Sequence, residues 1–487
     1  MGKAKISKSR YLKGLQCPKL LWWSVNEPDS KELEPDLLTQ HRFDVGNQVA
    51  ELARKLYKNG VLVEDKKDFN KWLNNTKEAI EAGQKVIYEA AFTTNEAFAA
   101  VDILEYSDQG WNVIEVKSSL DVKDSYINDL AIQTWVLRKG GLNVNKTQVL
   151  TLNRNYKHPK SDLFSKHDVT EKVLQRQLEV PANVSRFVKT IDGDLPEYKT
   201  GKHCKSPYPC PFKDRCFGVR SKHHISTLYR IDDDKVNEFE KNGITEVSHL
   251  SNHGELSKIQ RRQYESVKNN NVVVEPSLNR ELSKIIYPIA YLDFETIMPA
   301  VPLYDGDKPY QTVPVQFSCH LEQESGEMAH YEWIASIDQD PRSEMASSLL
   351  TACESAKTII AYNAKFEKYC IELIADKATK LADRLINLNG KFVDLLPIVR
   401  NHVYHPEFMG SFSLKKVLPA LVKELNYADL EVQDGMTASI LLERALSGIA
   451  DFENETRQIL LDYCHLDTLA MQHLLEHLRR LESKIHL

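Results

Sequence analysis

The sequence has no long hydrophobic run. No segment approaches the roughly 18 consecutive apolar residues that a membrane-spanning helix needs, and no repeat or low-complexity tract is visible in the 487 residues. The first residues, MGKAKISKSRYLKGLQ, are basic but lack the apolar stretch of a secretory signal. Hydrophobic residues make up 42% and charged residues 27%, which is a globular composition. We therefore expect a cytoplasmic, multidomain protein that does not contact a membrane.

The overall basic excess of a simple nucleic-acid-binding protein is also missing. The net charge is −6, yet residues 1–220 carry 35 Lys and Arg against 29 Asp and Glu, so the acidic excess lies in the remainder. This distribution argues against a binder that relies on a basic patch in the second half. It does not exclude nucleic acid, because the carboxylates of a metal-dependent nuclease are neutralised by their cations.

Alternating strand and helix patterns predict an α/β protein. The elements expected first are a helix at 41–58, strands at 86–92, 99–106 and 111–119, a helix at 124–138 and a strand at 147–156. The pattern restarts with strands at 286–296, 315–323 and 358–363, followed by helices to the end. We place domain boundaries near residues 220 and 285, so that a polar, helical connector occupies 221–285.

Three residues on neighbouring predicted strands suggest a metal site. Glu115 and Lys117 share a face because side chains two apart on a strand point the same way, and Asp102 reaches them if the strands pair. Two carboxylates can hold a divalent cation that activates water at a phosphate, and the lysine can orient the nucleophile. The spacing alone also arises by chance. However, Asp102, Glu115 and a third acid, Glu89, stand among apolar neighbours, where an uncompensated charge is costly.

The series VIYEAAF, AAVDIL, VIEVKSS and DLAIQTWVL resembles the PD-(D/E)xK nuclease core of RecB-type enzymes. The resemblance implies a restriction-endonuclease-like core within residues 1–220, with Asp102 and Glu115 as metal ligands. The catalytic residues that it implies are Asp102, Glu115, Lys117 and Gln133. The chain departs from the family in two places. Ala99 and Ala100 replace a glycine, and Gly46 is not followed by the metal-binding histidine of many members.

Closely spaced cysteine pairs of the kind found in zinc fingers are absent. Instead, Cys17 stands far upstream of the clustered Cys204, Cys210 and Cys216. In a chain without a secretory signal, clustered cysteines suggest metal ligation before disulfides. The arrangement resembles that of RecB-type nucleases in which four cysteines hold a [4Fe–4S] cluster. In that family the cluster joins the N-terminal helix to the end of the domain. Zinc is the alternative occupant.

A second acidic set lies in the C-terminal part. Asp293 and Glu295 are two apart on a mostly apolar strand and so share a face. Glu367 follows a later strand, and Tyr463 lies one helical turn before Asp467. Four carboxylates around one pocket suit two divalent ions that clamp a phosphodiester, while a tyrosine positions the attacking water.

This order of motifs resembles the DEDD 3′–5′ exonuclease superfamily in its tyrosine-bearing form. The resemblance implies an RNase H-like domain over 286–487. The catalytic residues and metal ligands implied are Asp293, Glu295, Glu367 and Asp467, with Tyr463 catalytic but not a ligand. Glu367 stands where the family has aspartate, and Asp394 is a further acid that could compensate. The two domains in this order resemble an uncharacterised bacterial family that fuses a RecB-like nuclease to a DEDD-type domain, and 241–252 loosely resembles a helix-hairpin-helix module.

We therefore predict a nuclease that requires Mg²⁺ or Mn²⁺ and acts on DNA or RNA, with single-stranded DNA or DNA ends as the expected partners. The alternative is a nucleic-acid-binding adaptor in which one or both sites are inactive. That alternative stays open because no metal-binding histidine follows Gly46 and because Glu367 stands where the family has aspartate. A metal-stapled scaffold for protein–protein contacts is a third possibility.

Overall fold

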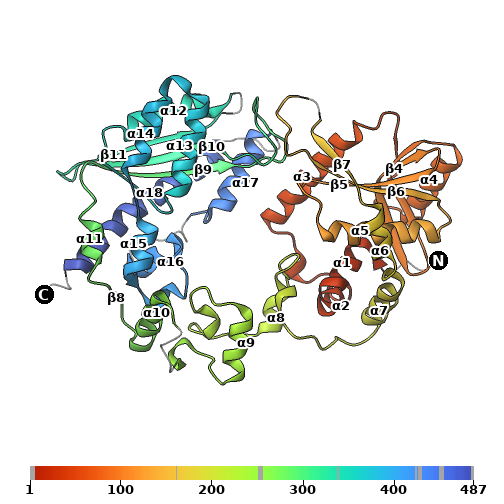
Figure 1. Ribbon diagram of the computed structural model, residues 1–487, viewed down its shortest axis with the longest axis horizontal. Helices are drawn as coiled ribbons and strands as arrows, with labels where there is room; N and C mark the ends of the chain where they lie inside the picture. The colour runs from red at the N-terminus through yellow and green to blue at the C-terminus, as the bar shows by residue number, and fades with distance from the viewer. Residues whose placement is uncertain are drawn as a thin grey trace. The chain divides into compact units, whose positions relative to one another are not determined.

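The computed structural model describes residues 6–160, 162–250, 256–336, 339–422, 425, 430–448 and 454–483. It confirms the predicted α/β class, with helices alternating with the strands of two large sheets. Backbone proximity divides the chain into two units, each with its own large sheet (Figure 1). Unit 1 comprises Met1–Val219 and Pro299–Gln311, and unit 2 comprises Arg220–Met298 and Thr312–Leu487.

Unit 1 contains a seven-stranded sheet in the order β2-β3-β4-β5-β6-β7, with β1 paired to β4. Its strands are β1 (Ile6–Ser7), β2 (Val61–Leu62), β3 (Val86–Thr93), β4 (Ala97–Ser107), β5 (Gly110–Lys117), β6 (Val144–Leu152) and β7 (Phe164–Asp168). Its helices are α1 (Lys8–Gln16), α2 (Pro18–Asn26), α3 (Leu37–Arg54), α4 (Phe69–Glu81), α5 (Asp124–Lys139), α6 (Thr170–Gln177), α7 (Val180–Asp192) and α8 (Lys213–Phe217). The strands and helices predicted in this part are confirmed, with shifted ends.

The centre of unit 1 is an antiparallel meander followed by a helical crossover. Strands β3, β4 and β5 pair antiparallel, and β6 pairs parallel to β5. A parallel neighbour requires a crossover connection, which α5 provides. The turn between β4 and β5 places Gly110 at a φ of +126°, and a Cβ there would lie 2.7 Å from the carbonyl oxygen of Asn143. Most of α5 is buried, so its polar residues Asp129 and Gln133 need partners inside the fold.

Unit 2 contains a five-stranded sheet in the order β11-β10-β9-β12-β13 and a two-stranded sheet of β14 and β8. Its strands are β8 (Val273–Val274), β9 (Ile289–Ile297), β10 (Val313–Glu322), β11 (Met328–Ile334), β12 (Thr358–Ala361), β13 (Phe392–Asp394) and β14 (Val403–Tyr404). The three strands predicted for this part are confirmed as β9, β10 and β12. Strands β9, β10 and β11 are antiparallel, whereas β12 is parallel to β9 and to β13.

The helices of unit 2 include those of the predicted connector. They are α9 (Asp233–Lys241), α10 (Lys258–Asn269), α11 (Leu278–Leu282), α12 (Pro341–Cys353), α13 (Lys365–Lys377), α14 (Ala382–Leu388), α15 (Leu395–His402), α16 (Leu414–Leu421), α17 (Gly435–Leu446) and α18 (Asn454–Ser483). Of the stretch that resembles a helix-hairpin-helix module, residues 251 and 252 lie outside the described residues. None of the helices that the structure describes is both long and apolar enough to cross a membrane.

The two faces of the unit 2 sheet differ in character. Leu292, Phe294 and Phe317 belong to an apolar core shared with α12, α13 and α14, which cover one face (Figure 1). Because side chains alternate along a strand, their neighbours point to the opposite face, which is polar and packs against α18. Gln316 there donates a hydrogen bond of 2.8 Å to the carbonyl oxygen of Leu460. This polar face carries the acidic residues predicted on β9.

Candidate functional sites

The residues predicted in unit 1 come together where the β4–β5 hairpin opens. The paired register of β4 and β5 runs only as far as Ile103 and Ile114, and beyond it Val116 N donates a 2.7 Å hydrogen bond to Asp102 Oδ2. Two further residues that the sequence reasoning did not single out join this group. We call it the first acidic site, and it consists of Lys8, Asp102, Glu115, Lys117, Asp129 and Gln133.

Hydrogen bonds and ion pairs connect the members of the first acidic site. Gln133 Nε2 donates to Glu115 Oε2 at 2.7 Å and to Asp129 Oδ1 at 3.0 Å. Lys117 Nζ lies 2.6 Å from Glu115 Oε1 and 3.0 Å from Asp129 Oδ2. Lys8 Nζ, from the first turn of α1, lies 2.9 Å from the same Glu115 oxygen and 3.9 Å from an oxygen of Asp129. The Lys8 ammonium group thus lies between Asp102 and Glu115, the carboxylates that were predicted to hold a cation. The Lys117 ammonium group lies between Glu115 and Asp129.

The charges of the first acidic site shift the pKa values of its carboxyl groups in opposite directions. Burial and the negative charge of Glu115 raise the pKa of Asp102 to about 7. Burial also acts to raise the pKa of Glu115, but the positive charges of Lys117 and Lys8 outweigh it and hold that pKa well below its usual range. Glu115 is therefore anionic at neutral pH, and Asp102 is close to its titration midpoint.

Glu89 adds a strained acidic residue beside this site. It stands between the β3–β4 pairs Tyr88–Ile103 and Ala90–Val101, which places it across from Asp102. Its φ of 57° lies in the left-handed region, which is uncommon for a non-glycine residue and costs energy. Arg54 Nη2 donates to Glu89 Oε1 at 2.7 Å. The third acid predicted among apolar neighbours is thus held by a guanidinium, and its charge contributes to the raised pKa of Asp102.

The four cysteines of unit 1 line one pocket of about 320 Å³, a volume that includes space open to solvent. Gln16, which precedes Cys17, donates hydrogen bonds of 2.8 and 2.7 Å to the carbonyl oxygens of His203 and Tyr208. Burial raises the pKa of Cys17, and raises that of Cys210 to about 11. Their sulfur atoms are not among the His, Cys, Asp and Glu groups of the described residues whose ligand atoms lie within 4.8 Å of one another. The structure therefore brings the four predicted cysteines to one pocket.

The four carboxylates predicted in unit 2 also converge, and with Tyr463 and Lys415 they form what we call the second acidic site. Asp293 and Glu295 on β9 and Asp467 on α18 each offer one oxygen, and these three oxygens lie within 4.8 Å of one another. Glu367, in the first turn of α13, is buried, and its charge acts on Asp293. Glu367 Oε2 has no hydrogen-bond partner among the described residues.

Mutual repulsion dominates the electrostatics of the second acidic site. Burial and the charge of Asp467 raise the pKa of Asp293 and of Glu295 well above the usual range. Burial raises the pKa of Glu367 to about 8. Buried like charges are costly unless a cation compensates them, so this group is suited to binding divalent cations through oxygen ligands.

Asp394, the further acid that could compensate for Glu367, is held by backbone hydrogen bonds. Its Oδ1 accepts hydrogen bonds from the backbone nitrogens of Asn363 and Leu396, each at 3.0 Å, and its Oδ2 accepts from Ala364 N at 3.1 Å. The carboxylate fixes the turn that leads into α13. It therefore positions the helix that carries Glu367.

Tyr463 lies at the acidic group together with a lysine that the sequence reasoning missed. Lys415 Nζ lies 2.9 Å from Tyr463 Oη and 2.5 Å from the carbonyl oxygen of Gln433. Burial and the charge of Asp467 raise the pKa of Tyr463 far above its usual value, and its hydroxyl interacts with that carboxylate. The hydroxyl is thus a neutral hydrogen-bonding group. No spacing in the sequence connects Lys415 with Tyr463, because they belong to α16 and α18.

Parts of this chain are similar to one protein family and to one individual protein. The family model described as "Domain of unknown function (DUF2779)" matches residues 290–413. The protein "Uncharacterized protein UU173" of Ureaplasma parvum is 25% identical over 232 residues, which cover 42% of this chain and 33% of that protein. The chain thus spans about a third of the length of this relative. The matched range 290–413 contains Asp293, Glu295 and Glu367, but neither Tyr463 nor Asp467.

Proposed function

We propose that this protein is a divalent-metal-dependent nuclease that hydrolyses phosphodiester bonds of DNA or RNA in the cytoplasm. The observation that carries the proposal is the second acidic site. Three of its carboxylate oxygens lie within 4.8 Å of one another. A fourth carboxylate, Glu367, has a buried oxygen without a hydrogen-bond partner in the described part of the chain. A surplus of buried negative charge fits Mg²⁺ or Mn²⁺ and a phosphate-cleaving reaction.

In the second acidic site, Asp293, Glu295, Glu367 and Asp467 would hold the cations. A bound divalent cation supplies Lewis acidity and neutralises the charge of the phosphodiester. Tyr463 would form a hydrogen bond with the attacking water, because its hydroxyl stays protonated. Lys415 fixes the orientation of that hydroxyl through the 2.9 Å contact.

The first acidic site would hold a cation through Asp102 and Glu115, where Glu115 is anionic at neutral pH. Gln133 orients the Glu115 carboxylate through a 2.7 Å hydrogen bond. Lys117 would stabilise negative charge that develops on the scissile phosphate. Its position is fixed by Asp129, whose carboxylate lies 3.0 Å from the ammonium group.

The strand orders support the finer fold assignments that go with this proposal. A meander of β9, β10 and β11 continued by the parallel strands β12 and β13 is the arrangement expected of an RNase H-like domain. In unit 1, helices precede the β3–β4–β5 meander, and α5 then crosses to the parallel strand β6. This order is the one expected of a restriction-endonuclease-like core.

The enzyme proposal is tested by incubating the purified full chain with end-labelled single-stranded and double-stranded DNA and RNA in Mg²⁺, Mn²⁺ or EDTA. We expect cleavage that requires the metal, with shortening from the 3′ end attributed to the second acidic site. Binding of the strands without cleavage in either metal would contradict the enzyme proposal.

A specific contact favours a second candidate, a nucleic-acid-binding adaptor whose first acidic site is inactive. Lys8 Nζ lies 2.9 Å from Glu115 and 3.9 Å from Asp102, so it occupies the space between the two predicted metal ligands. A cation bound by both carboxylates must displace it. If Lys8 is not displaced, the first acidic site binds no metal, and only Asp293-dependent cleavage remains in the assay.

The role of Glu367 is tested by two substitutions that differ in charge and reach. Glu367→Gln removes the charge and should lower turnover of the second acidic site by at least about 100-fold. Replacing a residue that only hydrogen-bonds to a metal ligand already lowers metal affinity or activity roughly 10- to 100-fold. Glu367→Asp keeps the charge and should retain activity. The readout is release of nucleotides from a 3′-labelled single strand. The control is Glu372→Gln, an exposed residue on the same helix. An unchanged rate in Glu367→Gln would show that Glu367 does not take part.

We also propose that Cys17, Cys204, Cys210 and Cys216 hold a [4Fe–4S] cluster, with zinc as the alternative. These four side chains line one pocket, and thiolates are the ligands that both occupants take. Protein purified without oxygen should be brown, and Cys210→Ser should lose the colour and lower the melting temperature of the full chain. Iron, sulfide and zinc analysis provide the measurement. A colourless protein with one zinc per chain would refute the iron assignment and keep the ligands.

A further inference from the structure

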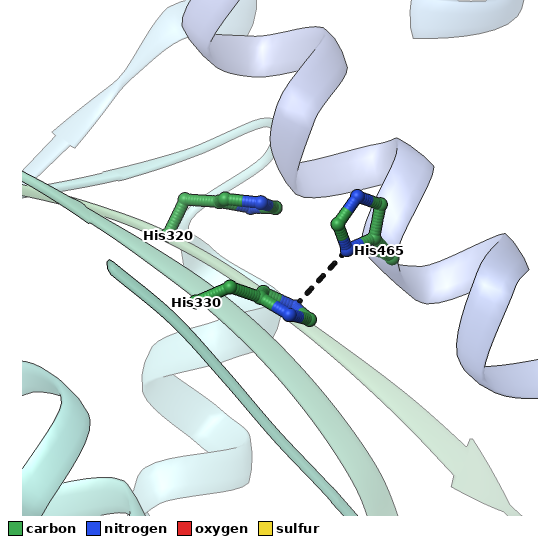
Figure 2. A group of neighbouring side chains, drawn as sticks. All are labelled: His320, His330 and His465. Atoms are coloured by element: carbon green, nitrogen blue, oxygen red, sulfur yellow. Dashed lines mark hydrogen bonds between the residues drawn. The ribbon is translucent and has the colours of Figure 1, made fainter. Parts of the chain in front are cut away.

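Unit 2 contains a second group of possible metal ligands that neither acidic site uses. His320 on β10 and His330 on β11 are directly paired across the two strands, and His465 projects from α18. Each offers one ring nitrogen, and the three nitrogens lie within 4.8 Å of one another. Figure 2 shows the three rings converging, with His465 opposite the other two. We call these residues the histidine cluster.

The distances within the histidine cluster fit a tetrahedral metal. Zn–N bonds of roughly 2.0–2.1 Å place two ligand nitrogens of a tetrahedral site about 3.3–3.4 Å apart. His330 Nε2 and His465 Nδ1 are 3.3 Å apart, and their rings are inclined at 83° (Figure 2). The rings of His320 and His465 have centroids 4.7 Å apart. The ring of His320 is thus close enough to supply a third ligand nitrogen to the same metal ion.

Neighbouring hydroxyl groups support the orientation that metal binding requires. His320 Nδ1 lies 2.8 Å from Thr468 Oγ1, which leaves Nε2 for a metal, and metal-binding histidines usually use their other nitrogen in this way. Ser318 Oγ lies 2.9 Å from His330 Nε2 but also 2.9 Å from Thr468 Oγ1, so it keeps a partner if that nitrogen turns to a metal.

We propose that His320, His330 and His465 bind one Zn²⁺ ion and leave its fourth position to solvent. Imidazole nitrogen suits zinc, whereas the carboxylates of the two acidic sites suit magnesium or manganese. Such an ion would join the β10–β11 hairpin to α18. This site is independent of the proposed nuclease activity, and its test does not require cleavage.

The test compares the zinc content of the untagged full chain with that of three variants. His330→Ala and His465→Ala each remove one ligand, and the matched control His473→Ala removes a histidine from the same helix two turns later. Each protein is stripped with a chelator, given zinc, dialysed and analysed by mass spectrometry. We expect the unmodified chain and the control to hold one zinc more than either ligand variant. Any zinc on the cysteines is common to all four proteins and cancels in the comparison.

Two further measurements separate loss of the ion from loss of the fold. Circular dichroism shows whether each variant is folded, and Co²⁺ at the histidine cluster should give visible d–d bands without additional thiolate-to-metal charge transfer. Zinc at about 100 times its Kd should raise the melting temperature of unit 2 by roughly 5–10 °C in the unmodified chain and not in His465→Ala. Equal zinc content in the unmodified chain and in folded ligand variants would overturn the proposal.

Discussion

Asp293→Asn should lower turnover of the second acidic site by at least about 100-fold. It removes the charge of a proposed metal ligand, and loss of a residue that only hydrogen-bonds to a ligand already lowers metal affinity or activity roughly 10- to 100-fold. Asparagine keeps the shape of the side chain. The pKa of Asp293 is raised by burial and by Asp467, so the neutral amide relieves repulsion and the melting temperature should not fall. The measurement is release of nucleotides from a 3′-labelled single strand with Mg²⁺, made alongside thermal unfolding of the full chain.

The matched control for this prediction is Asp462→Asn. Asp462 is an exposed acid on α18, accepts a 2.8 Å hydrogen bond from Gln458 and precedes Tyr463. Its replacement should leave turnover unchanged, which separates loss of a ligand from loss of negative charge on the helix. Both variants are made with Lys117→Ala so that the first acidic site does not contribute. Cleavage of equal rate in both would show that Asp293 does not hold a catalytic metal.

Short-range periodicity explains why much of both acidic sites was predictable. The two-residue repeat of a strand places Glu115 with Lys117, and Asp293 with Glu295, without knowledge of the fold. The helical repeat does the same for Tyr463 and Asp467. These pairs belong to elements whose buried faces are set by local hydrophobic pattern, so their position follows once the element is identified.

Two residues that reach a site from distant elements and belong to no motif, Lys8 and Lys415, were not predictable. Lys8 is 107 positions from Glu115, and Lys415 is 48 positions from Tyr463, so no spacing connects either pair. Asp129 is the exception, since a buried acid one turn before Gln133 is a detectable signal. Sequence also did not reveal that the carboxylate of Asp394 accepts hydrogen bonds from the backbone nitrogens of adjacent turns.

The histidine cluster illustrates the same limit. His320 and His330 are ten positions apart, and only the β10–β11 register pairs them. His465 lies far along the chain on α18, two residues before Asp467. The motif there was interpreted as acidic, through Asp467. Sequence spacing identifies zinc ligands when they lie in one short motif, whereas this set depends on how α18 packs on the sheet.

Lys117→Ala should reduce cleavage at the first acidic site by about 10²- to 10⁴-fold, the range found when a positioned catalytic group is lost. The structure adds a consequence for stability, because Lys117 lies between Glu115 and Asp129. Its loss leaves two buried carboxylates, and within the described part of the chain Lys8 is the remaining lysine paired with them. Without metal, the free energy of unfolding should fall by up to about 3 kcal/mol. Mn²⁺ should restore part of it, because a bound cation replaces the missing charge.

The assay for Lys117→Ala uses the Asp293→Asn background, so that any remaining cleavage comes from the first acidic site. The control is Lys146→Ala on the adjacent strand β6, whose exposed ammonium group pairs with Asp168 at 3.3 Å. A surface pair of this kind contributes about 0–1 kcal/mol, so the control should retain both stability and cleavage.

A further variant, Lys8→Gln, distinguishes the role of the Lys8 ammonium group from that of Lys117. If Lys8 only occupies the place of a cation, its removal should lower the Mn²⁺ concentration needed for cleavage, whereas the reduced cleavage by Lys117→Ala should not recover at any Mn²⁺ concentration. Equal cleavage by Lys117→Ala and its parent would exclude Lys117 from the reaction and leave it as a structural counter-ion of Glu115 and Asp129.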